Sequence, residues 1–254
     1  MSFPKIDQPI FTIELPVSGE KVKFRPYLSK EEKILMMAVE SAEEDTMIEA
    51  IKQIINNCAL TEIDVDKMAI IDLEYFFLNL RARSAGEKPT ARFRCRNIVE
   101  TNEVDETGGK ALTGECGNIM EIEFNLLDVK PTIPDRSRSV IMLTDKIGVK
   151  MKYPQFGMAK KINKTKIDTS SFQLLYDMIG DCIDMIFEGE AIYKVTPDNK
   201  DELQAFLDSL DRKQISKIEE FFDEMPELKH TIKTTCSKCN LKHEITLEGV
   251  QSFF

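Results

Sequence analysis

Histidine is nearly absent from this chain of 254 residues, which contains only His230 and His243. A serine or cysteine nucleophile is usually activated by a neighbouring histidine, so this scarcity removes a common arrangement for covalent catalysis. The phosphate-binding patterns G-x-x-x-x-G-K-[ST] and G-x-G-x-x-G are also missing. We therefore predict that the protein is not an enzyme and takes no small-molecule substrate.

Long apolar runs are missing too. No uninterrupted apolar stretch approaches the roughly 18 residues that a membrane-spanning helix needs, so we expect no membrane partner. The first residues, MSFPKIDQPIF, contain no basic segment followed by an apolar run, and we expect no secretory signal. The net charge of −10 makes nucleic acid an unlikely broad partner, because phosphates attract clustered cations.

Six cysteines are present, and an intracellular chain of this kind is not expected to form disulfides. Cys58 and Cys182 follow or lie within apolar runs of helical spacing, and we interpret both as small core residues. Cys95, Cys116, Cys236 and Cys239 remain to be explained.

An internal repeat organises the chain. Two segments, FTIELPVSGEKVKFRPYLSKEEKILMMA from Phe11 and RSVIMLTDKIGVKMKYPQFGMAKKI from Arg138, both predict strand, turn, strand, proline and helix. Each copy continues with helices and ends in a strand that leads to a cysteine. We therefore predict an α+β fold of two tandem copies, residues 1–130 and 131–254, each with a β-hairpin, helices and a zinc-ribbon-like hairpin, packed into one body.

The helices of the two copies carry different patterns. A helix from about Val65 to Arg83 is apolar on almost every side, which indicates a buried, central position. In the second copy, a stripe at helical spacing predicts a helix that continues through Ile186; its members are Phe172, Leu175, Tyr176, Ile179, Ile183 and Ile186.

The sequence TTCSKCNLKHEITLEG, from Thr234 to Gly249, has one C-x2-C knuckle and no second one after it. The first copy provides the missing half if residues 98–115 are a loop inserted into a C-x2-C turn, because their removal brings Cys95 and Cys116 to the same spacing. Gly117 and Asn240 follow the second cysteine of each pair, and both residue types adopt left-handed backbone easily. We therefore predict one structural zinc site with four thiolate ligands, Cys95, Cys116, Cys236 and Cys239.

Other interpretations of these cysteines remain open. They could be unligated, or only one knuckle could bind metal. Histidine ligands are not expected, because His230 and His243 lie roughly 20 Å and more than about 10 Å along an extended strand from the knuckle. A catalytic zinc is not favoured, since it would need an open position and a nearby general base.

Basic residues surround both cysteine pairs in the sequence. Six lie between Arg81 and Arg96 against one acid, and four lysines lie between Lys229 and His243. They could offset the charge of about −2 on a zinc tetrathiolate. The alternative is a zinc-ribbon regulator whose basic ribbon binds nucleic acid or a polymerase.

The chain resembles the baseplate hub and hub-assembly proteins of T-even-type bacteriophages. The segments that carry the resemblance are FTIELPVSGEKVKFRPYLSKEEKILMMA, DLEYFFLNLRARSAGE, the following FRC and the late C-x2-C hairpin. The resemblance implies a non-enzymatic tail protein, present in the central hub or acting on it, with other hub and tail proteins as partners. It places the protein in the host cytoplasm during assembly or in the tail baseplate of the virion.

Overall fold

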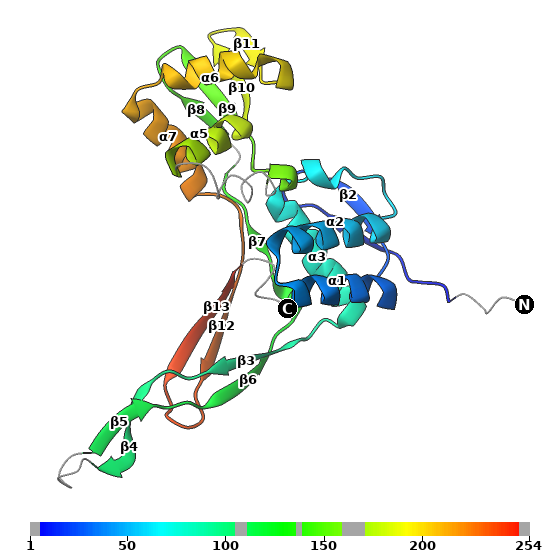
Figure 1. Cartoon of the computed structure of the whole chain (residues 1–254), viewed down its shortest axis with the longest axis vertical. Helices are drawn as coiled ribbons and strands as arrows, with labels where there is room; N and C mark the ends of the chain where they lie inside the picture. Colours follow the sequence, from blue (N-terminus) through cyan, green and yellow to red (C-terminus); the bar gives the residue numbers. More distant parts are fainter. Residues whose placement is uncertain (1–5, 105–110, 136–138, 159–170, 249–254) are drawn as a thin grey trace, which may run out of the picture.

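The computed structural model describes residues 6–104, 111–135, 139–158 and 171–248. Helices and strands form separate small groups instead of alternating around one sheet, which confirms the predicted α+β class. Figure 1 shows a helical body, a second body of sheet and helices, and paired ribbons that extend away from both. None of the described helices is long and apolar enough to cross a lipid bilayer.

The first body consists of a two-stranded sheet and three helices. Its elements are β1 (Phe11–Glu14), β2 (Lys21–Phe24), α1 (Ser29–Ser41), α2 (Glu44–Cys58), the 3-10 turn η1 (Val65–Lys67) and α3 (Ile70–Ala85). The prediction that the third helix is central is confirmed, because α3 buries side chains all around its axis: Ile71, Leu73, Phe76, Phe77, Leu78 and Leu80.

The third helix begins later than the sequence predicts, at Ile70 instead of near Val65. The N–H of Ile70 donates to the carbonyl of Pro154 at 3.0 Å, and Ala69 forms a β-bridge with Gln155. The backbone before α3 is therefore held extended by a partner from the other half of the chain, which helix periodicity cannot reveal.

A buried carboxylate on α3 holds the first hairpin against the helices. Asp72 is 1% exposed, and its two oxygens accept the backbone N–H groups of Val17 at 2.7 Å and Ser18 at 3.0 Å. The turn that these groups belong to includes Gly19 at φ +72°, in the left-handed region that glycine adopts without strain. Asp72 thus ties two successive N–H groups of the turn to the central helix.

A second buried carboxylate belongs to Glu31 at the start of α1. It accepts the backbone N–H of Leu28 at 2.9 Å and a guanidinium N–H of Arg25 at 3.1 Å. Burial alone would raise the pKa of Glu31, but Arg25 and Leu28 together hold it below its usual value. The contacts in the folded state therefore favour the charged form of Glu31.

The second body is a four-stranded sheet in the order β11-β10-β9-β8, covered by helices (Figure 1). Its elements are β8 (Val140–Met142), β9 (Ile147–Met151), α5 (Ser171–Cys182), β10 (Ile183–Glu188), β11 (Ala191–Lys194), η4 (Pro197–Asn199), α6 (Lys200–Asp208) and α7 (Arg212–Asp223). Its core cluster includes Val149, Met151, Ile179, Cys182 and Ile218.

The predicted helix through Ile186 is wrong in its second part. The helix ends at Cys182, and the next residues form β10 between β9 and β11. Apolar residues three apart, such as Ile183 and Ile186, also occur in a strand whose two faces are both partly covered, so the pattern did not distinguish the two structures. The strand packs closely here, because a side chain at Gly148 would lie 2.3 Å from the ring of Phe187. The side chains of Phe172 and Leu175 lie outside the described residues.

The two hairpins that the repeat predicts are both present, as β1 with β2 and β8 with β9. Their surroundings correspond: the N–H of Arg25 donates to the carbonyl of Cys58 at 3.0 Å, and the N–H of Lys152 donates to that of Cys182 at 2.7 Å. Cys58 and Cys182 are both fully buried, as predicted for core residues. These matching contacts favour the tandem-copy interpretation, whose boundary between residues 130 and 131 remains a prediction. The helix expected directly after Pro154 extends into residues outside the described part.

The ribbons consist of two antiparallel pairs. β3 (Thr90–Arg94) pairs with β6 (Ile119–Glu123), and β12 (Glu227–Thr235) pairs with β13 (Lys242–Glu248). The short β7 (Pro131–Thr132), which follows η2 (Leu126–Asp128), adds to β12. A cluster that contains Leu78 of α3, Leu126 and Leu228 packs the base of both pairs against the first body, so residues of both halves share one core.

Candidate metal centre

The four unexplained cysteines meet where the two ribbons cross. Their sulfur atoms all lie within 4.8 Å of one another, and Cys95, Cys116 and Cys236 are buried. The Sγ–Sγ distances are 3.7 Å for Cys95 with Cys239 and 3.7 Å for Cys116 with Cys236. A tetrahedral zinc with four sulfurs at about 2.3 Å requires sulfurs about 3.8 Å apart. The four cysteines could therefore hold one metal ion, with two ligands from each ribbon.

Each cysteine pair sits in a turn that points backbone N–H groups at sulfur. The backbone N–H of Asn97 faces the sulfur of Cys95, and that of Asn118 faces the sulfur of Cys116. In both cases the donor lies two residues after the cysteine. Those of Lys238 and Cys239 face Cys236, and that of Leu241 faces Cys239. Amide donors of this kind stabilise thiolates, which are the form that binds metal.

The residue after the second cysteine has left-handed backbone in both turns, as predicted. Gly117 has φ +67° and Asn240 has φ +58°. This conformation lets the chain reverse: the N–H of Gly117 donates to the carbonyl of Cys95 at 3.0 Å, and that of Asn240 to the carbonyl of Cys236 at 2.9 Å. The two turns thus have the same construction.

The segment that the sequence analysis described as an inserted loop forms a β-hairpin. β4 (Ile98–Val104) pairs with β5 (Ala111–Glu115), and the first pair in register is Ile98 with Glu115. At the base of the hairpin, the N–H of Cys116 donates to the carbonyl of Asn97 at 2.7 Å. The turn that carries Cys95 and Cys116 is therefore closed at the base of this hairpin. The Gly108–Gly109 stretch of the hairpin lies outside the described residues.

Three side chains place a nitrogen atom against a sulfur, and the sequence analysis predicted none of these contacts. The amide nitrogen of Asn97 lies 3.5 Å from Cys239 Sγ, and that of Asn118 lies 3.4 Å from Cys236 Sγ. His243 Nε2 lies 3.2 Å from Cys95 Sγ. The repeated Cys-x-Asn at Cys95 and Cys116 was a signal that could have found the two asparagines.

The distance argument predicted that neither histidine lies near the cysteines. It was right for His230 and wrong for His243, whose Nε2 lies beside Cys95. His230 stacks on Phe124 with ring centroids 5.8 Å apart, away from the cysteines. His243 reaches the site because it faces the other ribbon, where its ring contacts Phe93 edge to face at 5.3 Å. Its distance along its own strand therefore did not measure its distance to Cys95. Among the described residues, the group able to share a metal nonetheless consists of the four cysteines.

The thiols of the two ribbons differ in acidity. Burial raises the pKa of Cys95 to about 12. Burial also opposes ionisation of Cys236, but the N–H donors of its turn and the Asn118 amide lower its pKa to about 6. The N–H of Leu241 and the Asn97 amide lower the pKa of Cys239.

Several basic residues of the ribbons are paired with acids on the neighbouring strand. Cross-strand ion pairs include Arg92–Glu121 at 3.1 Å, Lys233–Glu244 at 3.0 Å and Lys229–Glu248 at 2.8 Å. Exposed pairs like these contribute little to stability, because water and salt screen the charges. They do show that counting charges along one strand overstated how cationic the ribbons are.

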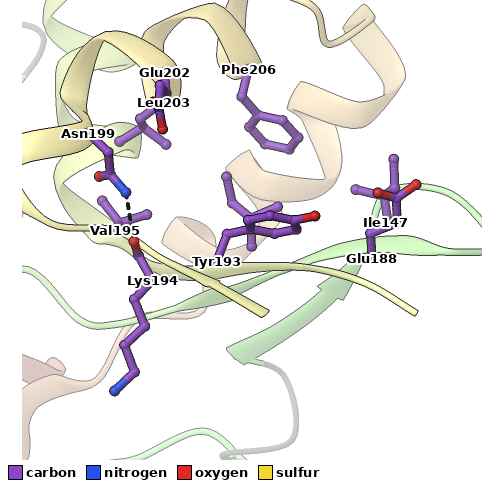
Figure 2. Close-up of a pocket in the computed structure, with 10 residues that line it drawn as sticks. Ile147, Glu188, Tyr193, Lys194, Val195, Asn199, Glu202, Leu203 and Phe206 are labelled. Carbon is purple, nitrogen blue, oxygen red and sulfur yellow. Dashed lines mark hydrogen bonds between the residues drawn. The ribbon is translucent and has the colours of Figure 1, made fainter. Parts of the chain in front are cut away.

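A concave region lies in the second body, between β10, β11 and α6. This cavity of about 240 Å³ is lined mainly by apolar side chains, including Ile186, Tyr193, Leu203 and Phe206, with Glu188 and Glu202 at its edge (Figure 2). The side chains that line it include no histidine or cysteine, so it offers no thiolate nucleophile and no soft metal ligand.

Comparison with known proteins gives one match. A family model described as T4 bacteriophage base plate protein matches residues 8–254, which include both ribbons and all four cysteines of the site. A search of curated proteins and a search of solved structures each found no match.

Proposed function

The chain belongs to the family of T4 bacteriophage base plate proteins, and from this premise we propose that it is a component or assembly factor of the central baseplate hub. It acts without catalysis, through contacts with other hub and tail proteins. It acts in the host cytoplasm during assembly or in the tail baseplate of the virion. The observation that carries this proposal is the extent of the family match, which covers nearly the whole chain.

The metal in this proposal is zinc, and its role is structural. Four buried or half-buried thiols at tetrahedral spacing suit zinc, which has no redox chemistry and accepts four sulfur ligands readily. Cys95 and Cys239 are 144 residues apart in the chain, and Cys116 and Cys236 are 120 residues apart. One ion would therefore join segments from both predicted copies. The resulting rigid ribbon pair is the feature that would present a defined surface to a partner.

Metal analysis tests the zinc part. We expect about one zinc per chain. Cys95→Ser and Cys239→Ser should each lose it, because each ribbon provides only two ligands. Cys58→Ala, which removes a buried thiol outside the site, should keep it. Full zinc occupancy in a variant that lacks both Cys95 and Cys116 would contradict a shared site.

Mixing experiments test the hub part. The protein should form a complex with hub subunits of the same phage in native mass spectrometry, and added DNA should leave that complex intact. Salt-sensitive DNA binding without any protein complex would instead support the zinc-ribbon regulator. The acidic net charge of −10 and the ion-paired ribbons weigh against that second function.

A further inference from the structure

We propose that Asn97, Asn118 and His243 form a hydrogen-bonding shell that crosses between the two ribbons and protects the thiolates from electrophiles and from loss of metal. This inference rests on the proposed zinc centre and assigns the residues that control its reactivity. None of the three is a metal ligand.

The direction of the three contacts is the first argument. Asn97 and Asn118 belong to the first ribbon and donate to Cys239 and Cys236 of the second, at 3.5 Å and 3.4 Å. His243 belongs to the second ribbon and contacts Cys95 of the first at 3.2 Å. The backbone N–H donors, by contrast, come from the same turn as the sulfur they face. The three side chains therefore each link a sulfur to the opposite ribbon, which the backbone N–H donors do not do.

The way His243 is held is the second argument. Its ring packs edge to face against Phe93 of the opposite ribbon, with centroids 5.3 Å apart, which fixes the orientation of the imidazole. The side chain is only half-buried, yet it is directed toward Cys95 and not toward solvent. Asn118 is fixed in a similar way, because its amide also donates to the hydroxyl of Ser237 at 3.1 Å.

Charge is the third argument. A zinc tetrathiolate carries about two negative charges, and these are costly in a buried site without donors. An N–H directed at sulfur withdraws electron density from its lone pairs, so the sulfur attacks electrophiles more slowly and releases metal less readily. Residues around metal ligands typically change metal affinity by about 10–100-fold.

The test compares the two histidines of the chain. His243→Phe keeps a ring against Phe93 but removes the nitrogen that faces Cys95. His230→Phe is the matched control on the same ribbon. Zinc-loaded full-length proteins are treated with iodoacetamide, and released zinc is followed with a coloured chelator. In the probe reaction a thiolate forms a bond to carbon, iodide leaves, and the thioether no longer holds the metal. Asn97→Leu and Asn118→Leu test the other two contacts.

We expect release from His243→Phe to be about tenfold faster or more, with His230→Phe close to the original protein. The cobalt-substituted proteins provide the second measurement. Their visible d–d bands should stay tetrahedral in His243→Phe, while the sulfur-to-cobalt charge-transfer band shifts. Unchanged release in all three shell variants would overturn the inference. If one variant fails to fold, the other two decide, because they act on different sulfurs. Failure of the original protein to bind any metal would instead refute the proposed zinc centre.

Discussion

Replacing Cys236 by serine should loosen the paired ribbons while the first body stays folded. The cluster around the sulfurs is small: besides three cysteines, its buried members are Met120 and Ile122. Side chains of this size contribute about 1.5–3 kcal/mol each when buried. The first body instead has a large cluster that includes Phe76 and Phe77. The ribbons should therefore depend on the proposed metal far more than the helices do.

The size of the effect follows from binding linkage. A metal whose free concentration is about a thousand times its Kd stabilises the form that binds it by about 4.1 kcal/mol. That is as large as the combined contribution of Met120 and Ile122, which is about 3–6 kcal/mol. Loss of the metal should therefore raise the opening equilibrium of the ribbons about a thousandfold.

Amide hydrogen exchange followed by mass spectrometry measures this opening. Peptides from β3, β6, β12 and β13 should exchange about a thousandfold faster in Cys236→Ser, and peptides from α3 should not change. Cys182→Ala, which alters a buried cysteine of the second body, should leave the ribbons protected. Equal protection of the ribbons in Cys236→Ser, or a uniform loss that includes α3, would refute the reasoning.

Three further predictions concern the rest of the fold. Replacing Ile98–Glu115 by two glycines should leave a folded, metal-binding protein, since the turn is closed below this hairpin; loss of soluble protein would show that the hairpin carries core residues. Asp72→Ala should lower the free energy of unfolding in urea by about 1–3 kcal/mol, because two N–H groups lose their acceptor, whereas the exposed Asp64→Ala should have little effect. The pKa of Glu31 is lowered by folding, so its contribution to stability is present above the unfolded pKa and is lost as the pH falls through the folded pKa. Glu31→Gln should therefore flatten the acid side of the curve of melting temperature against pH, and identical slopes in both proteins would contradict a role for the Arg25 contact.

Local rules in the sequence determined several parts of the structure. The two hairpins before Pro26 and Pro154 follow from alternation and turn residues, which act within a few positions. The buried α3 follows from apolar side chains all around one helix. The grouping of the four cysteines was predictable because one C-x2-C turn provides only two of the four ligands that a structural zinc site needs. Cys95 and Cys116 in the first copy were the remaining candidates.

Other parts depended on contacts between distant segments. β10 could be a helix by its apolar spacing, and it is a strand because β9 and β11 provide hydrogen-bond partners on both sides. The start of α3 depends on Pro154 and Gln155, which lie more than 80 positions later in the sequence. His243 approaches Cys95 only because two ribbons cross, since a side chain's distance to a site on another strand is set by packing and not by its position along its own strand.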